Sequence, residues 1–299
     1  MSQVISPLIF NSFTPAAMSQ NRTSLQTAIG AGGSYQIPSG VIAYNTQIGQ
    51  YSSNLPLNLV GDGKQITRLY PTGFSGPAIE FGIPANGNTV LCLEKFDIVG
   101  DQSQVLLHVQ NVSAPIFRDL TLDNGYYGMQ MLNTWASILE NCFFVNSKGI
   151  GLYIEGATTS NGYALKNCRF FNCGHPNTQA ALVVSSGDGI YIGQIDLEGC
   201  YAGIQLDGCT GVHIDTPYIE RNAHNPLAFI SPCQGIAITG GWIAGESGQP
   251  PSEWYIGNVQ HLKLNGTTLF NLTVKVESAS TSDVDFSTCK LINTTIQYV

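Results

Sequence analysis

The sequence is poor in charge. Asp, Glu, Lys and Arg make up 11% of its 299 residues, against about 25% in an ordinary soluble domain. Basic residues are the scarcest, since 12 Lys and Arg against 20 Asp and Glu give a formal net charge of −8. Because contacts to the phosphate backbone need clustered Lys and Arg, this balance argues against nucleic acid as a partner.

Long apolar runs and dense cysteines are also missing. No apolar run approaches the ~18 residues of a membrane helix, so membrane insertion is not expected. The first residues carry no positive charge, so no secretory signal is predicted. Eight cysteines are too dilute for a disulfide scaffold, and none lies in a CxxC pair or beside a His at zinc spacing. We therefore predict no cofactor and no metal site.

A repeat organises residues 93–293. Nine apolar anchors recur at steps of 17–32 residues: Leu93, Phe117, Leu139, Leu165, Leu197, Ile214, Ile238, Leu264 and Phe286. A second apolar residue follows each anchor by five positions. Three positions after the anchor, four copies carry a cysteine: Cys142, Cys168, Cys200 and Cys289. Seven positions after it, five copies carry an asparagine: Asn124, Asn146, Asn172, Asn271 and Asn293.

These aligned positions predict a parallel solenoid. One copy cannot bury its own apolar residues, so successive copies must stack and share a core, with like residues above like. Asn is favoured at the turns because it tolerates a left-handed backbone and can hydrogen-bond to neighbouring copies. The repeat length varies more than in leucine-rich or hexapeptide solenoids, and no helical connectors are visible. We therefore predict an all-β, right-handed, single-stranded parallel β-helix of about nine or ten coils.

The opening residues predict a cap and carry a resemblance. Residues 21–29 form a short amphipathic pattern, capped by Thr23 or Ser24, that places Leu25, Ala28 and Ile29 on one face. The strand-like segments 35–42, 57–63 and 66–71 follow. With these segments the chain resembles the pectate-lyase-like β-helix superfamily, especially its tailed-bacteriophage members. The predicted units are an anchoring extension (1–20), a capping helix with first strands (21–57) and the β-helix (58–299).

The resemblance implies a virion-surface role. It suggests a homotrimer, assembled in the host cytoplasm, that contacts phage capsid or tail proteins and in some cases a host surface polysaccharide. We interpret the chain as a structural or adhesive protein, either capsid decoration or tailspike-like. The alternative is a tailspike depolymerase, a glycoside hydrolase or lyase. The carboxylate motifs of the superfamily's polygalacturonases are not intact here, because Gly189 follows Asp188 where a second Asp is required.

The repeat alignment itself suggests a conditional catalytic site. One position after the anchors, Glu94, Arg118, Glu140 and Lys166 alternate in sign, as expected of a surface ladder of charge pairs. The alternation then breaks at Glu198 and Asp215. Asp196 and His213 lie one position before the same anchors, so stacking would gather these four groups: Asp196, Glu198, His213 and Asp215. Close carboxylates could serve sugar hydrolysis or bind Ca²⁺; otherwise they form a solvated acidic patch.

Aromatic residues near the carboxyl end suggest a second site. Trp242, Trp254 and Tyr255 bracket a long loop over residues 244–253. Exposed rings there could stack on sugar rings, since functional sites are often carried on loops. The alternative is that these rings pin the loop to the sheet or lie at a subunit contact.

Overall fold

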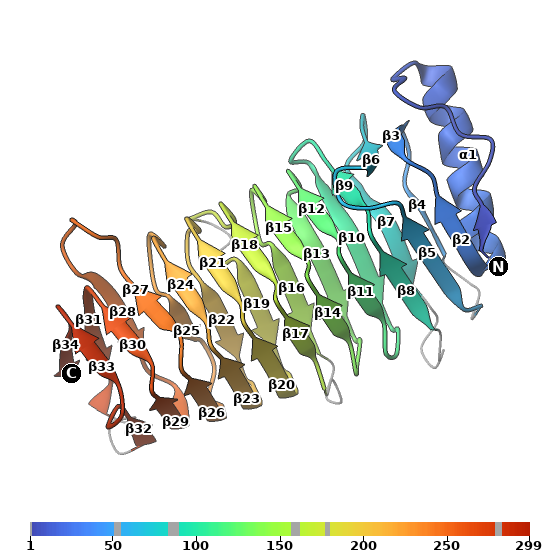
Figure 1. Ribbon diagram of the computed structural model, residues 1–299. Helices are drawn as coiled ribbons and strands as arrows, with labels where there is room; N and C mark the ends of the chain where they lie inside the picture. The colour runs from blue at the N-terminus through green and yellow to red at the C-terminus, as the bar shows by residue number, and fades with distance from the viewer. Residues whose placement is uncertain (1, 51–54, 83–89, 157–161, 177–179, 279–282) are drawn as a thin grey trace.

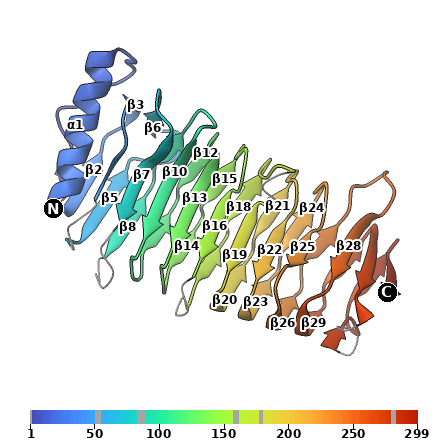
Figure 2. The ribbon, with the colours of Figure 1, turned by 180° about the vertical axis from the view of Figure 1, so that it is seen from behind.

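Short parallel strands wind into an elongated solenoid, and the helix α1 (Pro15–Ala31) lies across one end (Figures 1 and 2). The computed structural model describes residues 2–50, 55–82, 90–156, 162–176, 180–278 and 283–299. A typical coil contributes one strand to each of three sheets, so each strand pairs with those one coil before and after. The predicted all-β solenoid of about ten coils is confirmed. No helix in these ranges is long and apolar enough to cross a membrane.

The strands fall into four parallel sheets. Sheet A contains β1 (Gln3–Val4), β2 (Gly33–Ile37), β5 (Leu57–Gly61), β8 (Leu91–Glu94), β11 (Ile116–Arg118), β14 (Ile138–Glu140), β17 (Ala164–Lys166), β20 (Asp188–Gly193), β23 (Thr210–Asp215), β26 (Cys233–Thr239), β29 (Val259–Asn265) and β32 (Val284–Asp285). Sheet B contains β3 (Gly40–Tyr44), β6 (Thr67–Pro71), β9 (Asp97–Val99), β12 (Thr121–Asp123), β15 (Phe143–Val145), β18 (Arg169–Phe171), β21 (Asp196–Glu198), β24 (Tyr218–Glu220), β27 (Trp242–Ala244), β30 (Thr268–Phe270) and β33 (Lys290–Ile292). Sheet C contains β4 (Ile48–Gln50), β7 (Gly76–Gly82), β10 (Gln104–Gln110), β13 (Tyr127–Leu132), β16 (Leu152–Glu155), β19 (Leu182–Ser185), β22 (Ile204–Asp207) and β25 (Leu227–Phe229). Sheet D contains β28 (Ser252–Ile256), β31 (Leu272–Val276) and β34 (Thr295–Tyr298).

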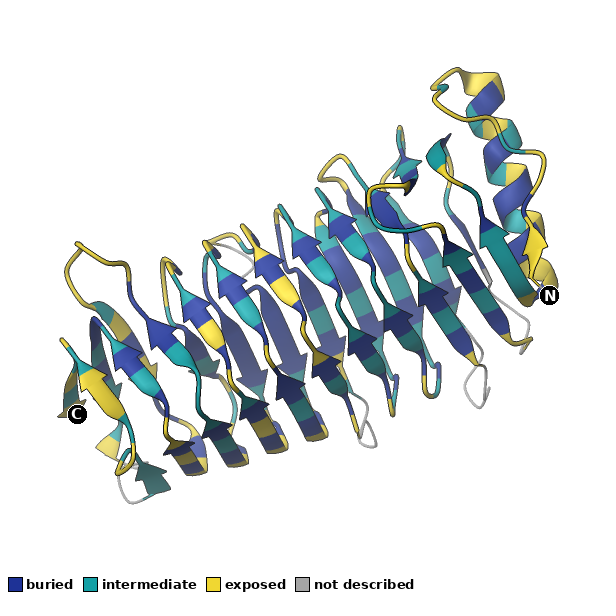
Figure 3. Ribbon diagram, in the orientation of Figure 1, coloured by how far each residue is buried: buried dark blue, intermediate teal, exposed yellow. Residues whose placement is uncertain are grey.

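The core is a stack of inward side chains. In the three-residue strands of sheet B, the middle residue points inward and its two neighbours point outward, as strand alternation requires. The middle residues Leu122, Phe144, Phe170, Leu197 and Ile219 are each at most 1% exposed. Figure 3 shows the same alternation of buried and partly exposed positions along the strands. Apart from Leu197, the apolar periodicity therefore identified these core-facing positions of sheet B correctly.

The predicted asparagine turns are confirmed. Asn124, Asn146 and Asn172 have positive φ angles of 61°, 53° and 54°, which a short polar side chain tolerates better than most residues. The Asn172 amide donates to Asn146 Oδ1 at 2.9 Å, and the Asn146 amide donates to Asp123 Oδ1 at 3.0 Å. This ladder of side chains joins successive coils at the end of sheet B.

The strand register corrects one repeat copy. Leu165 pairs with Ile192, and Leu197 pairs with Phe170, so Leu197 belongs to sheet B and not to the anchor column of sheet A. Ile192 and Leu197 are five residues apart, the same interval that separates anchor and second apolar residue in every other copy. An alignment displaced by five residues therefore also satisfies the apolar pattern of the repeat. The cysteine at position 200 lies three residues after Leu197, so it favours the displaced alignment, in which Leu197 is the anchor.

The cysteine column changes with the register. Cys142 and Cys168 lie after strands of sheet A and donate to backbone carbonyls of Phe117 and Leu139, one coil before. Cys200 lies after a strand of sheet B and is the counterpart of Cys173. The prediction that Cys200 shares a column with Cys142 and Cys168 was therefore wrong, although its side chain is buried as expected.

The capping helix is longer than predicted. It begins at Pro15, and Thr14 is its N-cap, with the Thr14 hydroxyl accepting from the Ala17 amide at 3.3 Å. The prediction of a cap at Thr23 or Ser24 was wrong, because Pro at the first helical position starts the helix one residue after a good N-cap. The expected boundary at residue 20 thus falls inside α1. Leu25 and Ile29 lie on its buried face, as predicted, and cover the end of the core.

Candidate functional site

The four conditional catalytic residues do not meet on one face. Asp196 and Glu198 point outward from β21 in sheet B, whereas His213 and Asp215 lie on β23 in sheet A. The prediction that stacking gathers them was wrong, because it depended on the shifted copy around Leu197. Gly193 pairs with Asp215, where Glu198 had been expected. Across the described ranges, no group of three or more His, Cys, Asp or Glu side chains could hold a metal ion.

Each of the four groups has a local partner. Asp196 forms an ion pair with Arg169 at 2.8 Å, and Glu198 forms one with Arg221 at 2.9 Å. On sheet A, Asp215 accepts from the Tyr191 hydroxyl at 3.3 Å, and His213 Nε2 lies 3.2 Å from the Thr239 hydroxyl. The predicted charge ladder of sheet A is confirmed for Glu94, Arg118 and Glu140, since Arg118 donates to both carboxylates.

The three aromatic residues also separate. Trp254 is fully buried, and its indole N–H donates to the carbonyl of Leu227 at 2.6 Å, so its ring cannot stack on a glycan. Tyr255 is 44% exposed and lines a pocket of about 580 Å³ with Lys275 beside sheet D. Trp242 lies on the outer face of sheet B, where it stacks on Phe270 with ring centroids 5.2 Å apart.

Two outward columns of side chains run along sheet B, one from the first and one from the third residue of each strand. The first column contains Thr121, Phe143, Arg169, Asp196, Tyr218, Trp242 and Thr268. The second column contains Asp123, Val145, Phe171, Glu198 and Glu220. A contiguous patch of exposed apolar side chains is a common feature of interaction surfaces. We call this surface, with its two columns, the sheet B face.

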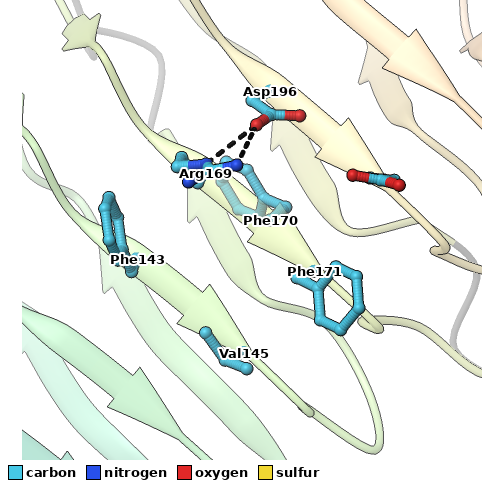
Figure 4. A pocket seen from close by; sticks show the side chains of 7 residues that line it. Phe143, Val145, Arg169, Phe170, Phe171 and Asp196 are labelled. Carbon is cyan, nitrogen blue, oxygen red and sulfur yellow. Dashed lines mark hydrogen bonds and ion pairs between the residues drawn. The ribbon is translucent and has the colours of Figure 1, made fainter.

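The first pocket on the sheet B face is formed by β15, β18 and β21 (Figure 4). It has a volume of about 210 Å³. The rings of Phe143 and Phe171 form its apolar part, and Phe171 is 51% exposed. Its polar part is formed by Glu198 and by the ion pair of Arg169 and Asp196, in which the guanidinium contacts only Oδ2 of Asp196. We call this the Arg169 pocket.

A second pocket adjoins it toward the amino-terminal end. It has a volume of about 310 Å³ and is formed by β6, β9, β12 and β15, with the turn at residues 62–66. Arg68 lies 3.7 Å from Asp97 Oδ2, which also accepts from the Gln65 amide at 2.7 Å. Lys64 donates to the carbonyl of Asn141 and lies 3.6 Å from the centroid of the Phe143 ring. We call this the Asp97 pocket.

Burial sets the electrostatics of the Asp97 pocket. Asp97 is only 3% exposed, and its burial raises the pKa of its carboxyl. Three contacts act to lower that pKa: hydrogen bonds from the Gln65 backbone N–H and the Thr121 hydroxyl, and the positive charge of Arg68. Burial lowers the pKa of Lys64, against the charges of nearby acidic groups. Both shifts reflect partial removal from water.

The main residues of these pockets were missed from sequence. Phe143 and Phe171 were passed over because their neighbours Phe144 and Phe170 match the inward column. A usable signal was present, since a residue next to an inward position of a strand must point outward. Phe143, Phe171, Tyr218 and Trp242 each adjoin an inward position, which identifies an outward aromatic series.

Comparison with known proteins supports the fold described above. A family model described as a right handed beta helix region matches residues 103–248. The chain therefore has the fold of a right-handed parallel β-helix. This match covers just under half of the chain and agrees with the right-handed β-helix fold predicted from sequence. A search of curated proteins found no match to the sequence.

Solved structures of other β-helix proteins share this fold. The gp42 tailspike of Acinetobacter phage vb_AbaP_AS12 has a TM-score of 0.63 and 11% identity over 98% of this chain and 61% of the tailspike. The N-terminal fragment of gene product 12 from bacteriophage Phi29 has a TM-score of 0.61 and 13% identity, over 93% and 60%. The Streptococcus pneumoniae surface protein and adhesin PfbA has a TM-score of 0.62 and 9% identity, over 100% and 97%. This β-helix thus spans about three fifths of the two phage proteins, and at these identities the likeness is one of fold.

Proposed function

We propose that this protein is a virion-surface β-helix of a tailed bacteriophage that binds a host surface glycan on its sheet B face. It would be assembled in the host cytoplasm and attached to capsid or tail proteins. The observation that carries the proposal is the row of outward aromatic rings flanked by guanidinium–carboxylate pairs. Rings offer flat apolar surfaces for the faces of sugars, and paired charges offer hydrogen bonds to hydroxyls.

The fold neighbours support the phage part of the proposal. Two of them carry phage names, one being a tailspike, and a third is a bacterial surface adhesin. Because one fold hosts many functions, the glycan-binding part depends on the side chains of the sheet B face rather than on these neighbours.

Removing the exposed rings should weaken glycan binding. We expect Phe143→Ala and Phe171→Ala each to lower affinity about two- to tenfold, since an aromatic contact contributes about 0.5–1.5 kcal/mol. The measurement is binding to an array of bacterial surface oligosaccharides, followed by calorimetry on those that bind. Tyr255→Ala serves as the contrast, because Tyr255 lines a different pocket. Loss of binding in Tyr255→Ala with full binding in Phe171→Ala would place the site beside sheet D instead.

The same experiment addresses the depolymerase alternative. The main candidates for its catalytic residues are Glu198 and Asp215. They lie on different sheets, so they do not form the close pair of carboxylates on which the hydrolase interpretation depends. Release of new reducing ends from a polysaccharide that binds would favour the depolymerase over the adhesive protein.

We also propose that the protein is a homotrimer. Ile230, which directly follows β25 on the side of sheet C, is 48% exposed. Contact between copies would remove such apolar side chains from water. Light scattering should therefore return about three times the chain mass of 32.0 kDa. A mass of one chain at micromolar concentration would contradict this assembly.

A further inference from the structure

The two pockets of the sheet B face repeat one arrangement. In each, an arginine faces the Oδ2 atom of an aspartate one strand further along: Arg68 with Asp97, and Arg169 with Asp196. In each, the other carboxylate oxygen, Oδ1, is buried and has no partner at hydrogen-bonding geometry. A buried acceptor without a donor costs about 1–3 kcal/mol, so each pocket is short of a donor.

The pockets also form one surface. Both are lined by Phe143 and Val145, so the Asp97 pocket adjoins the Arg169 pocket. The centres of the two pockets lie two to three strands apart, which is about 12 Å at ~4.8 Å per strand. A ligand that filled both would be a chain of several sugar rings rather than a single sugar.

The charges of this surface are nearly balanced and slightly negative. Its cations are Lys64, Arg68 and Arg169, and its anions are Asp97, Asp123, Asp196 and Glu198, which leaves a net charge of −1. Both guanidinium groups already face a carboxylate. The Lys64 ammonium is held by the Asn141 carbonyl and the Phe143 ring, between the pockets.

From these observations we infer the ligand class: a neutral, hydroxyl-rich glycan chain that lies across the strands of sheet B and donates hydroxyls to Asp97 and Asp196. The inference rests on the proposed glycan-binding function. The unpartnered buried atoms of the two pockets are two acceptors, Oδ1 of Asp97 and of Asp196, and one donor, Arg68 Nε. A sugar hydroxyl can both donate and accept a hydrogen bond, so it suits both kinds of atom. An acidic glycan would bring further acceptors and would place its carboxylates against a surface of the same sign, on a protein of net charge −8.

The probes are two matched series, neutral hexose oligosaccharides and oligouronates, each from disaccharide to octasaccharide. We expect the neutral series to bind, with affinity that rises with length until both pockets are filled. Affinity should change less than about twofold between low and high salt, because no ion pair forms with the ligand. Asp196→Asn and Asp97→Asn should each lower affinity about tenfold, since each weakens a hydrogen bond to a charged acceptor.

Matched variants separate the outcomes. Asp207→Asn makes the same chemical change on the outer side of sheet C and should leave affinity unchanged. Thermal melting shows whether Asp97→Asn still folds. If it does not, Asp196→Asn still tests the inference, because Asp196 is less buried than Asp97. Binding of the oligouronates that weakens with salt, or loss of binding in Lys64→Met alone, would overturn the neutral class and leave glycan binding in place. Failure of both series to bind would overturn the proposed function itself.

Discussion

Replacing Phe170 with alanine is expected to lower the free energy of unfolding by about 3–5 kcal/mol, the usual cost of truncating a buried aromatic ring. Phe170 is 1% exposed and stacks on Phe144 of the preceding coil, with ring centroids 4.6 Å apart. Truncation removes this contact and leaves a cavity in the middle of the solenoid. The neighbouring coils cannot move in to fill the cavity, because each is hydrogen-bonded to the coils on both sides of it. Urea unfolding followed by circular dichroism measures the loss.

The matched control is the next residue. Phe171 points outward and is 51% exposed, so Phe171→Ala should cost less than about 1 kcal/mol of stability. It should weaken glycan binding about two- to tenfold, whereas Phe170→Ala should lower stability. The opposite pattern would mean that β18 is displaced by one residue, because such a slip exchanges the two faces of a strand.

Replacing Trp254 with alanine is the second substitution expected to have a large effect. The residue is fully buried, so we expect a loss of about 3–5 kcal/mol in the free energy of unfolding. Trp254→Phe keeps most of the volume but removes the indole donor to the Leu227 carbonyl, at a cost of about 1–3 kcal/mol. Thermal or chemical unfolding of the two variants separates the packing contribution from the hydrogen bond.

Tyr255→Ala is the control for this position. Its exposed ring should contribute less than about 1 kcal/mol to stability. A Trp254→Ala variant that melts like the unsubstituted protein but no longer binds glycan would restore the interpretation of Trp254 as a sugar platform.

Only part of the candidate site could be predicted from sequence. The sequence singles out Asp196, Glu198 and Trp242, and all three lie on the sheet B face. Asp97 and Lys64 could not have been found, because their relation is created by folding. Lys64 reaches Asn141, 77 residues later, across several strands. Contact between Lys64 and Asn141 depends on the distance between strands of different coils, and the spacing of residues along the sequence does not give that distance.

The sequence by itself determined the architecture. Apolar residues at a fixed interval, with asparagine at the turns, can be buried only by stacking copies, so the parallel solenoid follows from local pattern and the hydrophobic effect. The tertiary structure alone decided which copy aligns with which around residues 165–214. Two alignments five residues apart satisfy the same apolar pattern, and only the hydrogen-bonded ladder distinguishes them, by pairing Ile192 with Leu165. That pairing places Asp196 and Glu198 on sheet B, away from Asp215 on sheet A, and beside the outward rings of Phe143 and Phe171.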